Sequence, residues 1–478
     1  MHRTSSMASI QNSFTARALE GAAALASTAW PVMERLLPER LEFDDTQSIW
    51  HAGTSDYRPR PSLEGSITAD LAIIGGGFTG VSTAYHIAQR FPQRRIVLLE
   101  ATSLANGASG RNGGLALNWI NGIDTSDPDL TRKVYGLTSA GLCAIRTLIE
   151  RHRLPVDHRF DGTLTLHTSP ERAEAAHAEG EYLRGLGIPV QFLYRNELAP
   201  QFNARGVYGA TFEPDTGQIN GAQFVRGLRP ILEERGVAIY EQTPVLRLRV
   251  GREIHLTTPR GEVRSQAVVL ATNGYTSKLG LFRDALFPLH SSVFATAPLT
   301  PAQREELGWR SFAGFADDRD RISYGSLTCT GHLVFGGGSN QAYAYLFNNR
   351  TRFPMQSGIA RRAQEAIRQT LLEYFPAASA LPIACRWSGV LGITLNRQPL
   401  WGRCGEYRNI YYALGYSGHG ITLANLAGEF IADLYGGDDS RWRWLPFYER
   451  RYPPIPPEPF RWLGYQAFTR LTGRSPRV

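Results

Sequence analysis

The stretch Asp-Leu-Ala-Ile-Ile-Gly-Gly-Gly-Phe-Thr-Gly, at residues 70–80, decides the fold of this chain. A short apolar run leads directly into the spacing Gly75-x-Gly77-x-x-Gly80. In a strand–turn–helix unit, Gly75 permits a tight turn, Gly77 lets the backbone approach a pyrophosphate, and Gly80 lets the helix pack closely on the strand. A pyrophosphate binds at the N-terminus of such a helix, where free N–H groups and the positive end of the dipole attract it.

Two neighbouring features make this spacing a specific prediction. A helix is expected over 78–90, and a second apolar run at 96–99 ends at Glu100. A carboxylate at this distance accepts hydrogen bonds from an adenosine ribose, and its charge disfavours a ribose phosphate. We therefore predict a dinucleotide-binding βαβ unit. The unit alone does not distinguish NAD from FAD, so a NAD-dependent reductase stays an alternative.

Length and composition indicate a globular protein with about two or three domains. The chain has 478 residues, of which 42% are hydrophobic and 20% charged, and no apolar run is long enough to span a membrane. Of the net charge of +8, the segment 441–478 supplies +6, because it has eight arginines and two glutamates. A nucleic-acid footprint should line a folded face, so we expect no nucleic-acid partner.

Cysteine usage and the N-terminus bear on location. The four cysteines lack the spacing of a zinc or redox motif, so we expect no metal site and a reducing, cytoplasmic location. Residues 1–19 contain arginine, serine and threonine but no acid, which is typical of a mitochondrial transit peptide and also of a disordered tail. A helix is expected over 16–36, with a kink at Pro31.

The remaining patterns give the organisation of the chain. Helices are expected over 139–153, 171–186, 220–234 and 460–471, strands over 162–167, 237–240 and 267–274, and an antiparallel pair over 321–324 and 332–335. We predict an α/β fold in which a Rossmann-type cofactor domain is assembled from residues 66–136, 200–283 and 383–437. Residues 137–199 and 284–382 would form an antiparallel-sheet substrate domain, and residues 1–65 and 438–478 would be extensions.

A second glycine-rich loop lies near the C-terminus. The residues Gly-Tyr-Ser-Gly-His-Gly at 415–420 follow a strand-like run at 409–414 and open another amphipathic helix. One dinucleotide needs only one pyrophosphate site, so this helix N-terminus should face a different group that gains negative charge. A reduced flavin is such a group, and a glycine turn that only permits tight packing is the alternative.

Taken together, the motifs resemble those of the D-amino-acid oxidase superfamily of flavoproteins. The motifs that carry the resemblance are the 75–80 turn with Glu100, the glycine-rich loop 107–114, Trp387-Ser388-Gly389 and the loop 415–420. Within the superfamily the chain is most similar to the γ-glutamylputrescine oxidase branch and more distantly to sarcosine oxidase. The resemblance implies FAD, a glutathione-reductase-like nucleotide domain, and oxidation of a C–N bond to an imine by hydride transfer to flavin N5.

The same resemblance implies a role for individual residues. Contacts with the pyrophosphate and the ribose are implied for Gly75, Gly77, Phe78, Thr79, Gly80, Glu100 and Ala101, and Val245 would contact adenine through its backbone. Contacts with phosphates and ribityl oxygens are implied for Ser109, Gly110, Arg111 and Asn112. The isoalloxazine ring would lie on Gly113, Gly114, Leu115 and Gly389, and its pyrimidine end would face Gly418, His419, Gly420, Ile421 and Thr422.

Three positions depart from the sarcosine oxidase pattern. Val334, or a neighbour within 333–336, stands where those enzymes place a lysine that activates oxygen, so a dehydrogenase that reduces a quinone or a partner protein stays open. Thr422 replaces a lysine that holds the substrate carboxylate, which argues against a sarcosine-like substrate. Cys385 lies outside the register of the flavin-linking cysteine, so we expect non-covalent FAD.

The predicted substrate is a small amine or amino acid, such as a γ-glutamylputrescine-like primary or secondary amine, with oxygen or another electron acceptor. His419 and Tyr324 are the candidates for catalysis or substrate contact, and a purely structural role is the alternative for each. Trp387 is expected to form a wall, and Arg397 to cap a turn. The aromatic and basic mixture in 438–478 suits peripheral contact with a membrane, but a tail folded back over its own domain is the preferred interpretation.

Overall fold

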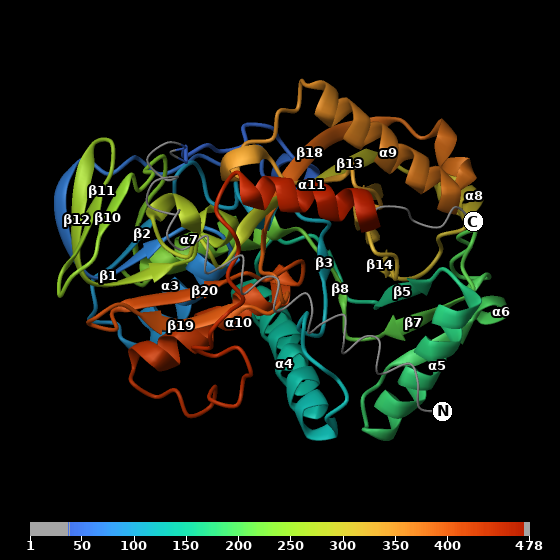
Figure 1. The fold of residues 1–478 in the computed structure, drawn as a ribbon, viewed down its shortest axis with the longest axis horizontal. Helices are drawn as coiled ribbons and strands as arrows, with labels where there is room; N and C mark the ends of the chain where they lie inside the picture. Colours follow the sequence, from blue (N-terminus) through green and yellow to red (C-terminus); the bar gives the residue numbers. More distant parts are fainter. Residues whose placement is uncertain (1–36, 38, 473–478) are drawn as a thin grey trace.

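Two large β-sheets organise the protein. The structure, a computed structural model, describes residues 37 and 39–472. The predicted helix over 16–36 and the segment 1–19 lie outside these residues. Figure 1 shows β1, β2, β10, β11 and β12 of the first sheet on one side of the molecule and β5, β7 and β14 of the second sheet on the other. A small third sheet contains β3 (Leu115–Ala116), β8 (Gly217–Ile219) and β4 (His158–Arg159).

The first sheet is the predicted dinucleotide-binding sheet. Its order is β10 (Arg247–Arg249), β11 (Ile254–Thr257), β12 (Gly261–Leu270), β1 (Gly65–Ile74), β2 (Ile96–Leu99) and β9 (Ala238–Tyr240), and β20 (Ile410–Leu414) with β19 (Leu400–Cys404) extends it from β12. β1 pairs in parallel with β2 and β12, and β12 pairs in parallel with β20. Segments that begin at residues 65, 261 and 410 therefore lie side by side, and the prediction of an α/β fold with a discontinuous Rossmann-type domain is confirmed.

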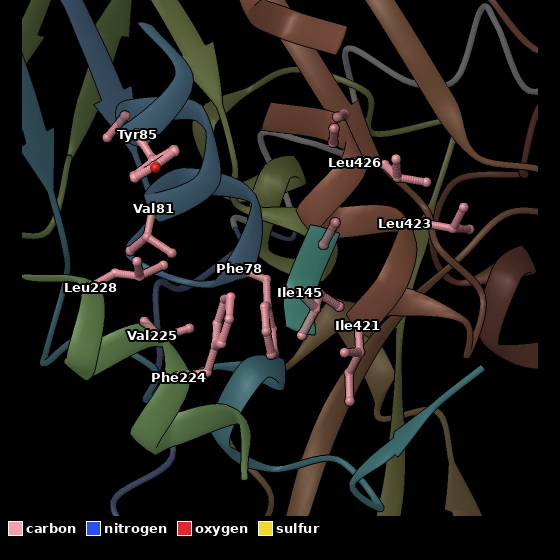
Figure 2. Packing of buried hydrophobic residues seen from close by; sticks show 14 of the residues in the cluster. Phe78, Val81, Tyr85, Ile145, Phe224, Val225, Leu228, Ile421, Leu423 and Leu426 are labelled. Atoms are coloured by element: carbon pink, nitrogen blue, oxygen red, sulfur yellow. The ribbon is translucent and has the colours of Figure 1, made fainter. Parts of the chain in front are cut away.

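A layer of helices covers one face of this sheet. It consists of α3 (Phe78–Arg90), α4 (Pro128–His152), α7 (Gly221–Glu234) and α10 (Gly420–Tyr435). Figure 2 shows α3 between α7 and α10, with the ring of Phe78 stacked on that of Phe224 at a centroid distance of 5.3 Å. The Ser82 hydroxyl of α3 donates to the Asn425 carbonyl of α10 at 2.5 Å. The two helices thus pack closely along their length, with their N-terminal ends on the same side.

The second sheet is larger than the first and contains strands from the middle of the chain. Its order is β17 (Tyr343–Ala344), β13 (Phe287–Pro298), β16 (His332–Gly337), β15 (Ser323–Leu327), β14 (Gly314–Asp317), β5 (Thr163–His167), β7 (Gly209–Glu213) and β6 (Gln191–Tyr194), and β18 (Ile383–Ile393) pairs with β13. The predicted pair over 321–324 and 332–335 is confirmed as β15 and β16. The sheet is mixed rather than wholly antiparallel, because β14 and β5 run parallel.

Several other helices match the predicted positions, with different ends. The expected helix over 139–153 is the second half of α4, which begins earlier because Asp127 caps its N-terminus and Pro128 occupies its first turn. The division of the chain into a cofactor domain and a substrate domain stays a prediction. The strands β7 and β18 come from ranges that were assigned to the cofactor domain, but both lie in the second sheet. The remaining helices are α2 (Ile49–Ala52), α5 (Pro170–Gly185), α6 (Arg195–Leu198), α8 (Pro301–Leu307), α9 (Gly358–Tyr374) and α11 (Phe460–Thr472).

Candidate functional site

The first glycine turn, between β1 and α3, is built so that side chains are excluded. Gly75 has a φ of +109°, a conformation that L side chains rarely adopt, and a Cβ there would meet the Ala271 carbonyl oxygen at 2.6 Å. A Cβ on Gly77 would meet the Ser109 hydroxyl at 2.6 Å, and a Cβ on Gly80 would collide with the Gly75 carbonyl. The predicted reasons for these glycines, a tight turn and close helix packing, are therefore visible in the geometry.

Glu100 closes this turn from the next strand. One carboxylate oxygen accepts the Gly76 N–H at 2.8 Å, and the other accepts the Thr102 N–H at 2.9 Å. Burial raises the pKa of Glu100 above its usual range. The Thr102 hydroxyl also donates to the same oxygen as the Thr102 N–H, at 3.3 Å, whereas the oxygen that accepts the Gly76 N–H has a further lone pair. Glu100 therefore fixes the turn and can still accept a hydroxyl from a ribose through that oxygen.

The glycine-rich loop 107–114 is held against this turn by α2. The Trp50 indole donates to the Asn112 carbonyl at 2.7 Å, and the Ser48 hydroxyl donates to the Gly110 carbonyl at 2.5 Å. A Cβ on Gly114 would meet the Trp50 ring at 2.8 Å. Ser48 and Trp50 thus hold the loop in place through its backbone carbonyls.

Two side chains in this loop differ from their predicted role. The Arg111 guanidinium does not reach outward to a phosphate, because it donates to the Thr46 carbonyl at 2.6 Å and to the Asn106 carbonyl at 2.6 Å. The Asn112 amide donates to the carbonyls of Ala108 and Ser109 and accepts the Gly114 N–H. Both side chains stabilise the loop from within, and the prediction that their polar groups contact the cofactor is not supported by these bonds.

The second glycine loop brings the N-terminus of α10 to the same place. The Tyr416 hydroxyl bonds with the Thr79 hydroxyl at 2.7 Å, so this loop and the first turn of α3 are joined directly. His419 lies at the start of α10, and its Nδ1 accepts a hydrogen bond of 2.8 Å from the Asn121 amide. Burial lowers the pKa of His419 to about 4. The ring is therefore neutral at physiological pH, and its proton is on Nε2.

One cavity of about 1280 Å³ connects both helix tips. The predicted residues that line it are Gly75, Gly77, Phe78, Thr79, Glu100, Ala101, Ser109, Arg111, Asn112, Gly113, Leu115, Val245, Tyr324, Gly389, Gly418, His419, Gly420 and Ile421. The volume exceeds the usual range of about 300–1,000 Å³ for small-ligand pockets, so a dinucleotide and a second molecule can share it. The convergence of two helix tips distant in sequence, on which the flavin interpretation depends, is present.

Other predicted residues lie behind the cavity wall. Gly80, Gly110 and Gly114 allow close packing but do not line the cavity. Thr422 is buried, and its hydroxyl donates to the Leu117 carbonyl at 2.7 Å, because this turn of α10 faces β3 and α4. Val334 is buried in the core. The Thr422 side chain therefore does not face the cavity at the pyrimidine end of the flavin, as the resemblance implied, and Val334 does not line the cavity.

The second sheet covers the cavity above loop 107–114. The Tyr324 ring packs on Gly113, where a Cβ would meet it at 2.5 Å, and its hydroxyl bonds with the Ser291 hydroxyl at 2.7 Å. Burial raises the pKa of Tyr324 to about 12, so its hydroxyl stays protonated. Trp387 does not line the cavity: it is buried, and its indole donates to the Arg111 carbonyl at 2.9 Å, so the expected wall is not confirmed. Arg397 lies exposed at the rim of the cavity in a turn with a φ of +62°.

The C-terminal segment closes another side of the cavity. Phe460, Tyr465 and Phe468 of α11 line it, and the Tyr465 hydroxyl donates to the Tyr343 carbonyl at 3.2 Å. α11 therefore folds back over its own chain, as Figure 1 shows for the red helix beside β13 and β18. Within the described residues, no helix has the length and apolarity needed to cross a membrane.

Sequence reasoning missed several polar groups that line the cavity. These are Asn121, Glu213 and Ser291, which belong to separate loops and strands and carry no motif. Only the pairing of the second sheet brings Ser291 and Glu213 to the cavity, so no local pattern could have identified them.

The residues present fit a flavin dinucleotide. Two helix N-termini, the Glu100 carboxylate and glycines without room for a side chain line one continuous cavity. None of the four cysteines forms a disulfide and none lines the cavity, so non-covalent binding of the cofactor stays a prediction. Across the described residues, no group of three or more His, Cys, Asp or Glu side chains is placed to hold a metal ion.

Comparison with known proteins agrees with this geometry. The family described as FAD dependent oxidoreductase (DAO) matches residues 70–434. The chain is 28% identical to gamma-glutamylputrescine oxidoreductase of Escherichia coli K12 over 410 residues, which is 83% of this chain and 91% of the relative. It is 24% identical to glycine oxidase of Geobacillus kaustophilus over 80% of this chain and 97% of the relative.

A solved structure shows the same fold. The crystal structure of glycine oxidase from Geobacillus kaustophilus superposes with a TM-score of 0.68 at 22% identity, covering 80% of this chain and 99% of that chain. The cofactor of the family is FAD, which sets aside the NAD-dependent alternative. The chain therefore belongs to the DAO family of FAD-dependent oxidoreductases, and it is an enzyme of the amine and amino-acid oxidase type that acts on C–N bonds.

Proposed function

We propose that this enzyme oxidises the C–N bond of a primary or secondary amine, of the γ-glutamylputrescine kind, to an imine. When bound, FAD supplies the hydride acceptor at flavin N5. The single observation that carries the proposal is that both helix tips line one cavity, which the second sheet covers at Tyr324 and Ser291. The match of 28% identity to an oxidoreductase named for γ-glutamylputrescine supports this choice of substrate class.

The residues of the chain act by position and polarity rather than as strong acids or bases. The N-terminal N–H groups of α10 stabilise negative charge that develops beside them. Tyr324 stays protonated and can donate or accept a hydrogen bond, but it cannot act as a base near neutral pH. His419 is neutral, because its pKa is about 4, and offers an N–H at Nε2. Apolar walls keep the amine of the substrate unprotonated.

A specific observation favours a second candidate, an amine dehydrogenase that reduces an acceptor other than oxygen. The chain contains only two lysines, Lys133 and Lys278, and neither lines the cavity. Lys278 is buried in an ion pair with Glu39 at 3.1 Å. No lysine ammonium is thus available beside the cofactor cavity to assist reaction with oxygen.

One experiment tests the proposed amine oxidation and distinguishes an oxidase from a dehydrogenase. The purified enzyme would be mixed anaerobically with a panel of amines and amino acids, and bleaching of the flavin absorbance would be recorded. We expect reduction by amines of the proposed class; no reduction by any member would contradict the proposal. Air would then be admitted: rapid return of the absorbance indicates an oxidase, and slow return that a soluble quinone accelerates indicates a dehydrogenase.

A further inference from the structure

Glu213 is a carboxylate in the cavity that the proposed reaction leaves without a role. It lies at the end of β7, and its Oε2 atom is buried without a hydrogen-bond partner among the described residues. A buried acceptor without a partner is costly, so such a group in a cavity indicates that a ligand supplies the missing donor.

The surroundings of Glu213 are acidic and aromatic. Burial raises its pKa to about 7, the Trp119 side chain lowers it in part through a hydrogen bond, and the charges of Glu179 and Asp215 raise it further. Trp119 lines the cavity, and its ring lies 5.2 Å from that of Tyr135, whose hydroxyl donates to Asp215 at 3.3 Å. Among the described residues no arginine or lysine forms an ion pair with Glu213, and the Arg146 guanidinium donates instead to the Asp215 carbonyl at 2.5 Å. This end of the cavity therefore attracts a cation.

Strand register places this acid at a defined distance from the proposed reaction centre. Glu213 pairs with Thr163 of β5, Thr163 with Gly314 of β14, and Gly314 with Ser326 of β15. Tyr324 lies two residues before Ser326, so it points to the same face of the sheet. Three strand spacings separate them, which is a lateral distance of about 14 Å.

That face of the sheet covers the loop on which the flavin ring is expected. The Ser326 hydroxyl donates to the Gly113 carbonyl at 2.7 Å, and a Cβ on Gly314 would meet the Leu115 side chain at 2.5 Å. Tyr324, Thr163 and Glu213 all line the same cavity. A long molecule can thus lie along the sheet face, with one end at Tyr324 and the other at Glu213.

We propose that Glu213 and Trp119 bind a second, distal ammonium group of the substrate, while the C–N bond that reacts lies beside Tyr324. The substrate class is therefore an elongated amine with two cationic ends, such as a long diamine or polyamine derivative. The proposal rests on the amine oxidation proposed above. A carboxylate hydrogen bond and the Trp119 ring together suit an alkylammonium ion.

The test compares diaminodecane with decylamine, which has the same chain and lacks the second ammonium. Their dissociation constants would be measured by calorimetry on the flavin-loaded enzyme, in parallel with anaerobic flavin reduction. We expect the wild-type enzyme to bind the diamine on the order of tenfold more tightly, as for a hydrogen bond to a charged group. Glu213→Gln should remove this preference without changing flavin content, and Glu179→Gln, at an exposed position outside the cavity wall, should retain it.

The pH dependence provides a second readout. Because the pKa of Glu213 is about 7, the preference for the diamine should grow as the pH rises through 7, and it should be flat in Glu213→Gln. Equal affinity of the wild type for both amines, or a preference that survives in Glu213→Gln, would overturn the proposal. If amines reduce the flavin but binding does not depend on Glu213, the proposed amine oxidation stands and the distal ammonium site is contradicted. If binding depends on Glu213 but no amine reduces the flavin, the ammonium site is supported and the proposed amine oxidation is contradicted.

Discussion

At the scale of the residue, Gly77 shows how the absence of one side chain makes room for a cofactor. Gly77→Val places a branched side chain where even a Cβ meets the Ser109 hydroxyl at 2.6 Å, so we expect near-complete loss of bound FAD. The ratio of flavin to protein absorbance after purification measures this loss. Gly136→Val in α4, where a Cβ has no neighbour within 4 Å, is the control and should retain full flavin. A Gly77→Val protein that purifies with full flavin would disprove the assigned pyrophosphate site.

A second prediction at this scale concerns the tautomer of His419. Asn121→Asp replaces the amide donor at Nδ1 with a carboxylate acceptor, which should move the proton to Nδ1 and raise the pKa of His419 from about 4. The flavin absorbance should then titrate between about pH 5 and 7, whereas the wild-type spectrum should be flat there because the ring is already neutral. The double variant Asn121→Asp/His419→Gln should lose this titration, and its persistence there would assign it to another group.

The limits of sequence reasoning are also clearest for single side chains. Gly75, Gly77 and Gly80 could be predicted because their roles depend on backbone geometry within a few residues. Arg111 and Thr422 could not, because the direction of each side chain depends on a distant partner, namely residues 44–46 for Arg111 and the Leu117 carbonyl for Thr422. Glu213 was missed because only the register of four strands brings it to the cavity.

At the scale of the element, the C-terminal segment has two parts with different roles. Trp442 is fully buried, with its ring 6.1 Å from that of Trp401, so deletion from residue 441 would open the core. α11 lies instead over the cavity, and Phe460, Leu463, Phe468 and Leu471 are each more than half exposed. The aromatic residues near Trp442 thus pack in the core, whereas those of α11 help to close the cavity.

We predict that deletion of residues 460–478 leaves a folded flavoprotein with a more accessible flavin. Iodide should quench its fluorescence several-fold more strongly, and KM for the amine should rise, because Tyr465 and Phe468 no longer close the cavity. Co-sedimentation with anionic vesicles, before and after the deletion, tests peripheral membrane contact through the exposed apolar side chains. Unchanged quenching would contradict a closing role for α11. Vesicle binding that the deletion leaves unchanged would exclude this helix as the membrane contact.

At the scale of the whole molecule, the predicted cofactor contacts come from segments that are far apart in the sequence. By this prediction the adenosine end would lie by Glu100 and Val245, and the flavin end by Gly389 and the N-terminus of α10, all of which line the cavity. Added to the apoprotein, FAD at 100 times its Kd should raise the free energy of unfolding by about 2.7 kcal/mol. FMN at the same concentration should stabilise much less, because it lacks the adenosine end. Urea unfolding curves measure both values, and equal stabilisation by the two flavins would contradict the assignment of Glu100.

The fold class could be predicted because the dinucleotide-binding βαβ unit has a local sequence signature. The division of the chain into a cofactor domain and a substrate domain could not be predicted in the same way. β7 and β18 have strand patterns that do not specify a partner, and long-range pairing placed both in the second sheet.

The parallel pairing of β12 with β20 also has a consequence for synthesis of the protein. The ribosome delivers β1 and α3 early, but β20 and α10 are translated only after residue 409. A nascent chain therefore carries the first helix tip of the cavity, at α3, long before the second tip, at α10, exists. A binding cavity with both helix tips can form only after residue 409 has been translated, and until then the edge of β12 that later pairs with β20 is an unpaired strand edge, the kind of edge that favours aggregation.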